Sequence, residues 1–172
     1  MRLTKYWRLG LTHVLPLLVW MLVIFSFSSQ SYDQQDLRPW LKDRVPEQVI
    51  KEHFSSVKVN YHGSEVSIRK KGVPGFVEFF IRKGAHVFEY ALLGLLSARL
   101  LWRLLRGRIG LTLLCSLLFC AIYSTSDEVH QIFTPNRTPM ATDVLLDSSG
   151  AAFGILLLMA YYWFMKRRSH SL

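Results

Sequence analysis

One apolar run decides the fold: residues 9–27 read LGLTHVLPLLVWMLVIFSF. The run holds 19 residues without a formal charge, and a helix of about 20 apolar residues crosses the hydrocarbon core of a bilayer. Uncharged runs of 18 residues follow at 109–126 and at 148–165. The sequence therefore predicts a membrane protein with at least three transmembrane helices.

Composition agrees with this interpretation. Hydrophobic residues make up 51% of the 172-residue chain and charged residues 19%, compared with about 25% charged residues in soluble domains. This apolar content excludes a disordered chain. The net charge of +9 lies beside the apolar runs, so it indicates membrane flanks and not a nucleic-acid site. Cys115 and Cys120 point about 140° apart on a helix, so they do not form a disulfide framework.

A cleaved signal peptide is the competing interpretation of the first run, because basic residues precede it. Signal peptides carry roughly 7–15 apolar residues followed by a small-residue cleavage site of the Ala-x-Ala type. The run at 9–27 is longer, and no such site follows it. We interpret it as an uncleaved first span.

A weaker apolar stretch at 76–101 is a candidate for one more span. Its first half is crowded with charged residues, among them Glu78, Arg82 and Glu89. Counting it gives an all-α membrane protein, a four-helix transmembrane bundle with spans at about 9–27, 76–101, 109–131 and 141–165. These spans form a single domain, 1–172, with an insertion at 31–75.

Basic clusters set the expected orientation. They are Arg2, Lys5 and Arg8; Arg103, Arg106 and Arg108; and Lys166, Arg167 and Arg168. The positive-inside rule puts all three clusters in the cytoplasm. Four spans satisfy this arrangement, so both termini are predicted to be cytoplasmic.

The segment 31–75 is predicted to lie outside the cytoplasm as a small structured subdomain. It carries eight Lys or Arg and six Asp or Glu, and long loops translocate with little regard to charge. Leu37, Trp40, Leu41 and Val45 recur at helical spacing, which indicates a short helix. Apolar and polar residues alternate on both sides of 62–64, which indicates a β-hairpin. Pro74 suits the first turn of the next helix.

In this topology the polar residues of all four spans gather at the outer end. Three stripes follow helical spacing: Lys83, His86, Tyr90, Gly94 and Ser97; Ser116, Cys120, Ser124, Asp127 and Gln131; and Asp143, Asp147, Gly150 and Gly154. Ionisable groups that face lipid cost several kcal/mol each, so such stripes face the bundle interior. This convergence favours a functional pocket over a purely structural network.

Simpler explanations exist for individual residues. Gly150 and Gly154 suit close helix packing, and Arg82 and Glu89 suit a structural ion pair. Lys83 suits a side chain that extends toward the lipid headgroups. We expect Arg137, six residues before Asp143, to lie at the mouth of the pocket and to be close enough to pair with it.

Two charged blocks carry a resemblance to a known family. Residues 82–94 read RKGAHVFEYALLG, and residues 126–131 read SDEVHQ, followed by Arg137 and by DVLLDSSG at 143–150. Both resemble motifs of the VanZ-like family, and the end of the first run, FSFSSQ at 25–30, is also similar to many members. The resemblance implies a multi-pass protein of the bacterial cytoplasmic membrane that is linked to the cell envelope and to teicoplanin resistance. It does not imply a reaction, so whether the chain is an enzyme stays open.

Three functions remain as alternatives. The first is recognition of an anionic lipid-linked cell-wall intermediate or a glycopeptide among the membrane lipids. The second is an enzyme that acts on a lipid-linked phosphate by acid–base chemistry or with a divalent metal. The third is a transporter, which would have to be a dimer because four spans are few for alternating access. The oligomeric state is not specified by the sequence.

The polar residues that gather at the outer end of the spans are also the candidate site residues. We assign catalytic roles to His86, Asp127, Glu128, His130, Asp143 and Asp147, and substrate binding to Arg82, Lys83, Glu89, Tyr90, Gln131 and Arg137. No residue is assigned as a metal ligand and no cofactor is named. A Mg²⁺ ion on Asp127, Glu128, Asp143 and Asp147, or a Zn²⁺ ion on His86, Glu89 and His130, stays an alternative.

Overall fold

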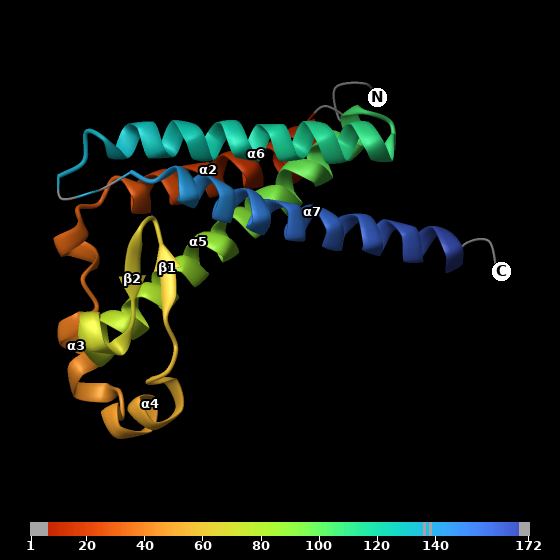
Figure 1. Ribbon diagram of the computed structural model, residues 1–172. Helices are drawn as coiled ribbons and strands as arrows, with labels where there is room; N and C mark the ends of the chain where they lie inside the picture. The colour runs from red at the N-terminus through yellow and green to blue at the C-terminus, as the bar shows by residue number, and fades with distance from the viewer. Residues whose placement is uncertain (1–6, 136, 138, 169–172) are drawn as a thin grey trace.

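The computed structural model describes residues 7–135, 137 and 139–168, and long helices dominate this part of the chain (Figure 1). The first helix runs over Trp7–Ser28, with a π-helical turn η1 (Gly10–Val14) before α2 (Leu15–Ser28). The other long helices are α5 (Ile68–Leu104), α6 (Ile109–Gln131) and α7 (Ala141–Arg168).

Within the described residues, three helices are long and apolar enough to cross a membrane: Trp7–Ser28, α6 and α7. They coincide with the three uncharged runs of the sequence, so the prediction of a mostly helical membrane protein is confirmed. Helix α5 is not among them, because charged residues interrupt its first half. The count of four spans therefore stays a prediction.

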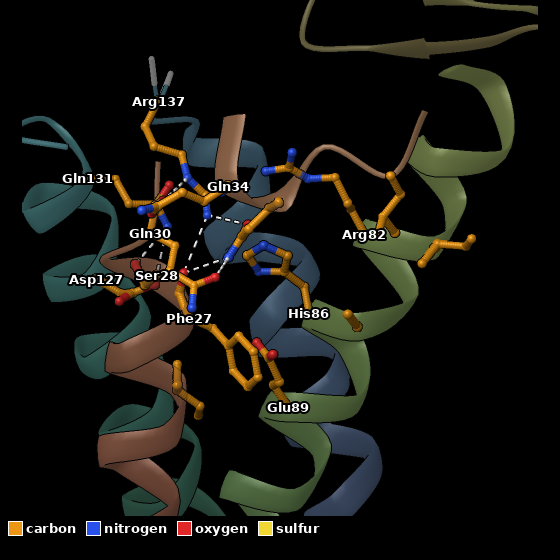
Figure 2. Close-up of a pocket in the computed structure, with 15 residues that line it drawn as sticks. Phe27, Ser28, Gln30, Gln34, Arg82, His86, Glu89, Asp127, Gln131 and Arg137 are labelled. Atoms are coloured by element: carbon orange, nitrogen blue, oxygen red, sulfur yellow. Dashed lines mark hydrogen bonds between the residues drawn. The ribbon is translucent and has the colours of Figure 1, made fainter. Parts of the chain in front are cut away.

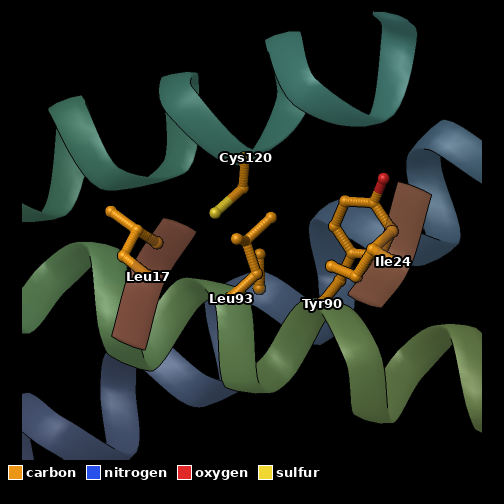
Figure 3. Packing of buried hydrophobic residues seen from close by; sticks show 6 residues of the cluster. Leu17, Ile24, Tyr90, Leu93 and Cys120 are labelled. Carbon is orange, nitrogen blue, oxygen red and sulfur yellow. The ribbon is translucent and has the colours of Figure 1, made fainter. Parts of the chain in front are cut away.

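Helix α5 lies at the centre of the arrangement and packs against α2, α6 and α7 (Figure 1). Tyr90 and Leu93 on α5 are fully buried against Leu17 and Ile24 of the first helix and Cys120 of α6 (Figure 3). The ends of α2 and α6 and the beginning of α7 lie at the same end of the bundle as α3 and the hairpin (Figure 1).

The segment between α2 and α5 is a structured subdomain, as predicted. It consists of a 3₁₀ turn η2 (Tyr32–Gln35), helices α3 (Arg38–Arg44) and α4 (Glu47–Phe54), and strands β1 (Val59–Tyr61) and β2 (Ser64–Val66). The prediction of one short helix was incomplete, because α4 follows α3. The apolar side of α4 packs on α5, a contact that the local sequence does not reveal.

The hairpin was predicted correctly, with Val59 paired to Val66 in an antiparallel register. His62 and Gly63 both have positive φ, 49° and 73°, which matches the twist of the flanking strands. The second strand ends earlier than the alternation suggested, because Ile68 already begins α5.

Helix α5 begins eight residues before the predicted span at 76. It is capped by Ser67, whose hydroxyl accepts a hydrogen bond from the Lys70 amide, and it is kinked at Gly72, with φ 66°. Pro74 directly follows this kink, so it opens the second section of the helix, as expected.

Glu78 fastens the subdomain to α5. Its buried carboxylate accepts hydrogen bonds from the Leu37 amide and from the Tyr32 hydroxyl, both 3.0 Å long. Burial and this carboxylate together raise the pKa of Tyr32. The subdomain is thereby held over the end of the bundle where the polar stripes begin.

Candidate functional site

Glycine residues bring α5 and α7 into close contact and thereby align their polar residues. A Cβ atom on Gly150 would lie 2.5 Å from the Val87 carbonyl oxygen, and one on Gly94 would lie 2.4 Å from the Ala151 carbonyl oxygen. The predicted packing role of Gly150 is therefore confirmed. Both helices run away from the subdomain, so their acidic and basic residues meet one or two turns before this contact.

One ion pair and one hydrogen bond join α5 and α7 on the subdomain side of the glycine contact. The Lys83 Nζ atom lies 2.6 Å from Asp143 Oδ1, and the His86 Nδ1 atom lies 3.1 Å from Asp147 Oδ1. The other oxygen of Asp147 accepts a 2.6 Å hydrogen bond from the Ser124 hydroxyl on α6. Asp147 is thus buried with two partners, and the polar stripes of three helices meet at this point.

The hairpin takes part in the first of these contacts. The Tyr61 hydroxyl donates to the Asp143 carboxylate, and the Lys83 ammonium lies 4.5 Å from the centre of the Tyr61 ring. Burial raises the pKa of Tyr61, and the Asp143 carboxylate raises it further. Asp143 therefore connects α7, α5 and the subdomain.

Helix α6 contributes two buried acids. Asp127 Oδ2 accepts a 3.3 Å hydrogen bond from the Gln131 amide, which also donates to the Ser28 hydroxyl of α2. Glu128 accepts a 2.7 Å hydrogen bond from the Met140 amide just before α7. Neither forms an ion pair within the described residues.

Two adjoining cavities, of 380 Å³ and 280 Å³, open beside these groups. Ligand sites commonly measure roughly 300–1,000 Å³. Arg82, His86, Gln131 and Arg137 line both cavities, and we call the two together the polar pocket. The larger cavity is also lined by Ile24, Phe27, Ser28, Gln30, Gln34, Gln35, Leu37, Ile81, Ala85, Glu89 and Asp127 (Figure 2).

Two guanidinium groups reach into the polar pocket from opposite sides (Figure 2). Within the described residues, neither Arg82 nor Arg137 forms an ion pair with a carboxylate. The NH1 atom of Arg82 is buried without a hydrogen-bond partner, and its guanidinium stacks on the Tyr32 ring at 4.6 Å.

Arg137 binds neutral oxygens at the end of α2. It donates to the backbone carbonyls of Gln30 and Phe27, 3.1 Å and 3.4 Å away, and to the Gln35 side chain. Burial lowers the pKa of Arg137, and the nearby Arg82 lowers it further. Both guanidinium groups thus lie in the pocket without a neutralising carboxylate among the described residues. Arginine in such a setting can pair with a phosphate or a carboxylate group.

One comparison with known proteins found a match. A family model described as VanZ/LLP1 matches residues 13–164, a range that contains every polar stripe and both guanidinium groups. This chain belongs to the VanZ/LLP1 family. Comparison with curated proteins gave no match, and neither did comparison with solved structures.

Most of the predicted site residues of this VanZ/LLP1 chain line the polar pocket. They are Arg82, Lys83, His86, Glu89, Asp127, Gln131, Arg137 and Asp143. Asp147 lies behind His86 and orients its ring. Their common location agrees with the prediction that the polar residues of the spans lie at one depth. Location alone does not assign their chemical roles.

Three predicted residues lie away from the pocket lining. Tyr90 is fully buried in the core below it. His130 contacts α2, with its ring 4.8 Å from that of Phe25 and its Nε2 atom 3.2 Å from the Ser29 hydroxyl. Glu128 faces the start of α7. The spacing of the polar residues predicted which face of a helix they occupy. It did not predict which neighbouring helix or loop covers that face.

Two ion pairs that the sequence allowed are not formed. Arg82 does not pair with Glu89, because its guanidinium turns toward Tyr32. Arg137 does not pair with Asp143, because Asp143 is occupied by Lys83 and Tyr61 while Arg137 holds the end of α2. The proximity of Arg137 to the pocket was predicted correctly, and its partner was not.

No metal centre is formed by the residues that the structure describes: no three His, Cys, Asp or Glu side chains come close enough together to hold an ion. Asp143 and Asp147 lie on one face of α7 but turn to different partners on α5. His86 contacts Asp147 of α7, whereas His130 contacts Ser29 of α2. The alternatives of a Mg²⁺ site and of a Zn²⁺ site therefore lack the required geometry.

Sequence reasoning missed the contribution of the insertion to the pocket of this family member. Tyr61, Gln34 and Gln35 line it, as does Tyr32. The alternation of Tyr61 with polar neighbours indicated that its side chain lies on one face of the hairpin. The glutamines at 30, 34 and 35 recur at one-turn spacing. Neither signal shows that the subdomain folds over the bundle end.

Proposed function

We propose that this VanZ/LLP1 protein binds an anionic, lipid-linked molecule of the bacterial envelope in the polar pocket. The observation that carries the proposal is the guanidinium group of Arg82, a residue of the pocket lining whose NH1 atom is buried without a hydrogen-bond partner. A buried cationic donor without an acceptor is costly, and a phosphate or carboxylate oxygen removes that cost. Arg137 offers further donors from the opposite wall.

The proposal includes four spans in the bacterial cytoplasmic membrane, with α5 as the second span and both termini in the cytoplasm. Support comes from the burial of α5 against the three apolar helices. Arg103, Arg106, Arg108 and the basic end of α7 lie at the ends of the helices away from the subdomain, as the positive-inside rule requires. The polar pocket then opens at the outer surface of the membrane.

Lipid-like glycopeptides such as teicoplanin combine an anionic group with a hydrocarbon chain, so the proposal extends to them. Cells that produce the chain would then tolerate more teicoplanin than cells that produce an Arg82→Gln variant at equal abundance. Equal tolerance at equal abundance would exclude the glycopeptide as a ligand and leave lipid binding to be tested by itself.

A direct test compares farnesyl phosphate with farnesol, which have the same chain and differ in the phosphate. The full chain is purified in detergent, and bound ligand is counted by native mass spectrometry. We expect saturable binding of the phosphate and little binding of the alcohol. Arg82→Gln should weaken binding at least tenfold, because a charge-assisted hydrogen bond contributes about 1.5–3 kcal/mol.

Arg44→Gln is the matched control. Arg44 is a cation of the subdomain that stacks on Trp40 at 4.7 Å, and it lines neither cavity. Its substitution removes one positive charge without touching the pocket. Equal loss of binding in both variants would mean that net charge, and not the pocket, attracts the phosphate.

A second function, hydrolysis of a lipid-linked phosphate, is favoured by one observation. His86 lines the pocket while its Nδ1 atom is held by Asp147, and Asp147 is held by Ser124. An imidazole oriented in this way accepts a proton through its other nitrogen. A water oxygen would attack phosphorus, the bond from phosphorus to the lipid oxygen would break, and His86 would pass the water's proton to the departing alcohol.

Phosphate release from farnesyl phosphate tests this second function. Hydrolysis predicts release by the purified chain and at least a hundredfold slower release by His86→Gln, with binding of farnesyl phosphate retained. Binding without release in the unaltered chain would leave the protein as a binding protein only.

A further inference from the structure

An apolar groove of 520 Å³ lies next to the polar pocket. Ile50 and Phe54 of α4 form one side, and Phe76, Val77, Phe80 and Ile81 of α5 form the other. Only apolar side chains of the described residues line it. Its volume falls within the range of roughly 300–1,000 Å³ that ligand sites occupy.

The groove and the polar pocket share one lining residue. Ile81 lines both the groove and the larger cavity of the pocket, and Arg82 follows it in the chain. Val77, Ile81 and Ala85 are spaced four residues apart, so they form one apolar stripe on α5 that leads from the groove into the pocket.

The groove is also placed where hydrocarbon is available. Phe76, Val77 and Phe80 begin the predicted span at 76–101, and Trp40 of the adjacent α3 is 55% exposed, as expected of an aromatic side chain at a membrane interface. Phe54 and Phe80 are 45% and 44% exposed. Such a patch of large apolar side chains needs an apolar cover.

We propose that the groove holds the hydrocarbon chain of the same anionic lipid whose headgroup occupies the polar pocket. The inference rests on the proposed function and makes it more specific: the ligand is a phosphate-bearing lipid whose chain leaves the pocket past Ile81 and lies between α4 and α5. The long insertion of this chain then has a role, because α4 supplies one wall of the chain site.

Photo-crosslinking tests the position of the chain. A decyl phosphate with a diazirine at the chain end is added to the full chain in detergent, and the labelled peptide is identified by mass spectrometry. We expect saturable labelling of α4 and of residues 76–81. A decanol with the same diazirine should label these residues no more than it labels the lipid-facing side of α6.

Variants separate the two parts of the ligand site. Phe80→Ala should reduce labelling in the groove at least threefold, whereas Phe88→Ala should not. Phe88 is on the same helix and is 64% exposed, but it lines neither the groove nor the pocket. Arg82→Gln should abolish the phosphate-dependent part of the labelling, because the headgroup anchors the chain.

The outcomes distinguish this inference from the function on which it rests. Labelling that depends on Arg82 but maps to α2 or α6 would overturn the groove assignment and leave headgroup binding intact. Labelling of the groove that is unchanged in Arg82→Gln would show that detergent or bulk lipid fills it, which overturns the inference. The absence of saturable labelling anywhere would overturn the proposed function itself.

Discussion

A Cβ atom on Gly154 of α7 would lie 1.8 Å from the carbonyl oxygen of Ala91 on α5. The two helices therefore approach so closely that only hydrogen fits at this position. Two turns earlier on α7, Asp147 reaches His86 because the same contact fixes the relative position of the helices. The packing of α5 against α7 thus determines the geometry of the polar pocket.

Gly154→Ala is expected to separate α5 from α7 and to destabilise the protein. Overpacking costs about 1–3 kcal/mol, and here the clash is with backbone that cannot rotate away. Gly84→Ala is the matched control, since a Cβ there would meet nothing within 4 Å and alanine favours helix by up to about 1 kcal/mol. Thermal unfolding in detergent should show a lower midpoint for Gly154→Ala only, and equal midpoints would contradict the close contact.

Asp143→Asn is expected to destabilise the attachment of the subdomain. The substitution leaves the Lys83 ammonium without its anion, and breaking such a charged hydrogen bond costs about 1.5–3 kcal/mol. In a double-mutant cycle with Lys83→Met, the combined loss of stability should be smaller than the sum of the single losses. Additive losses would mean that the pair contributes nothing.

The Asp143→Asn variant also tests whether Asp143 has a structural or a chemical role. If Asp143 is structural, protein abundance, thermal stability and teicoplanin tolerance should fall in parallel. If Asp143 has a chemical role, tolerance should be lost while abundance stays normal. A fully active Asp143→Asn protein at normal abundance would exclude a functional role for this carboxylate.

Stability should fall at alkaline pH partly because of Tyr61. Burial and the Asp143 carboxylate raise the pKa of Tyr61 in the folded protein, whereas an unfolded tyrosine has a pKa of about 10. The stabilisation that protonated Tyr61 contributes is therefore fully present below about pH 10. It is lost as the pH rises through the pKa of Tyr61 in the folded protein. Above about pH 10, the unfolding midpoint should fall more steeply with rising pH than in Tyr61→Phe. Parallel curves would argue against the contact with Asp143.

Single cysteines test the topology. In a background with Cys115→Ser and Cys120→Ser, Ser56→Cys should react with a membrane-impermeant maleimide in intact cells, because Ser56 is exposed in the subdomain. Arg106→Cys, in the turn before α6, should react only after the cells are opened. The reverse pattern would place the subdomain in the cytoplasm and the polar pocket with it.

The long apolar elements were predictable from local sequence. Uncharged runs at 9–27, 109–126 and 148–165 became helices because a long apolar segment needs all its backbone hydrogen bonds made internally. The β-hairpin was predictable from alternation and from a turn at His62 and Gly63 that accepts positive φ. The order of these elements also predicted that basic clusters flank the spans at one end. It predicted as well that acidic and basic residues gather at one depth near the other end.

The partners of each polar residue depended on tertiary structure. Lys83 and Arg82 are neighbours in sequence, yet Lys83 is paired with Asp143 while the NH1 atom of Arg82 is left without a partner. Helical spacing assigns a side chain to a face, but the identity of what lies opposite depends on the glycine contact between α5 and α7 and on the subdomain that folds over the bundle end. The sequence by itself determined which residues share a depth and a face; only the packing of helices decided which charges neutralise each other and which remain directed into the polar pocket.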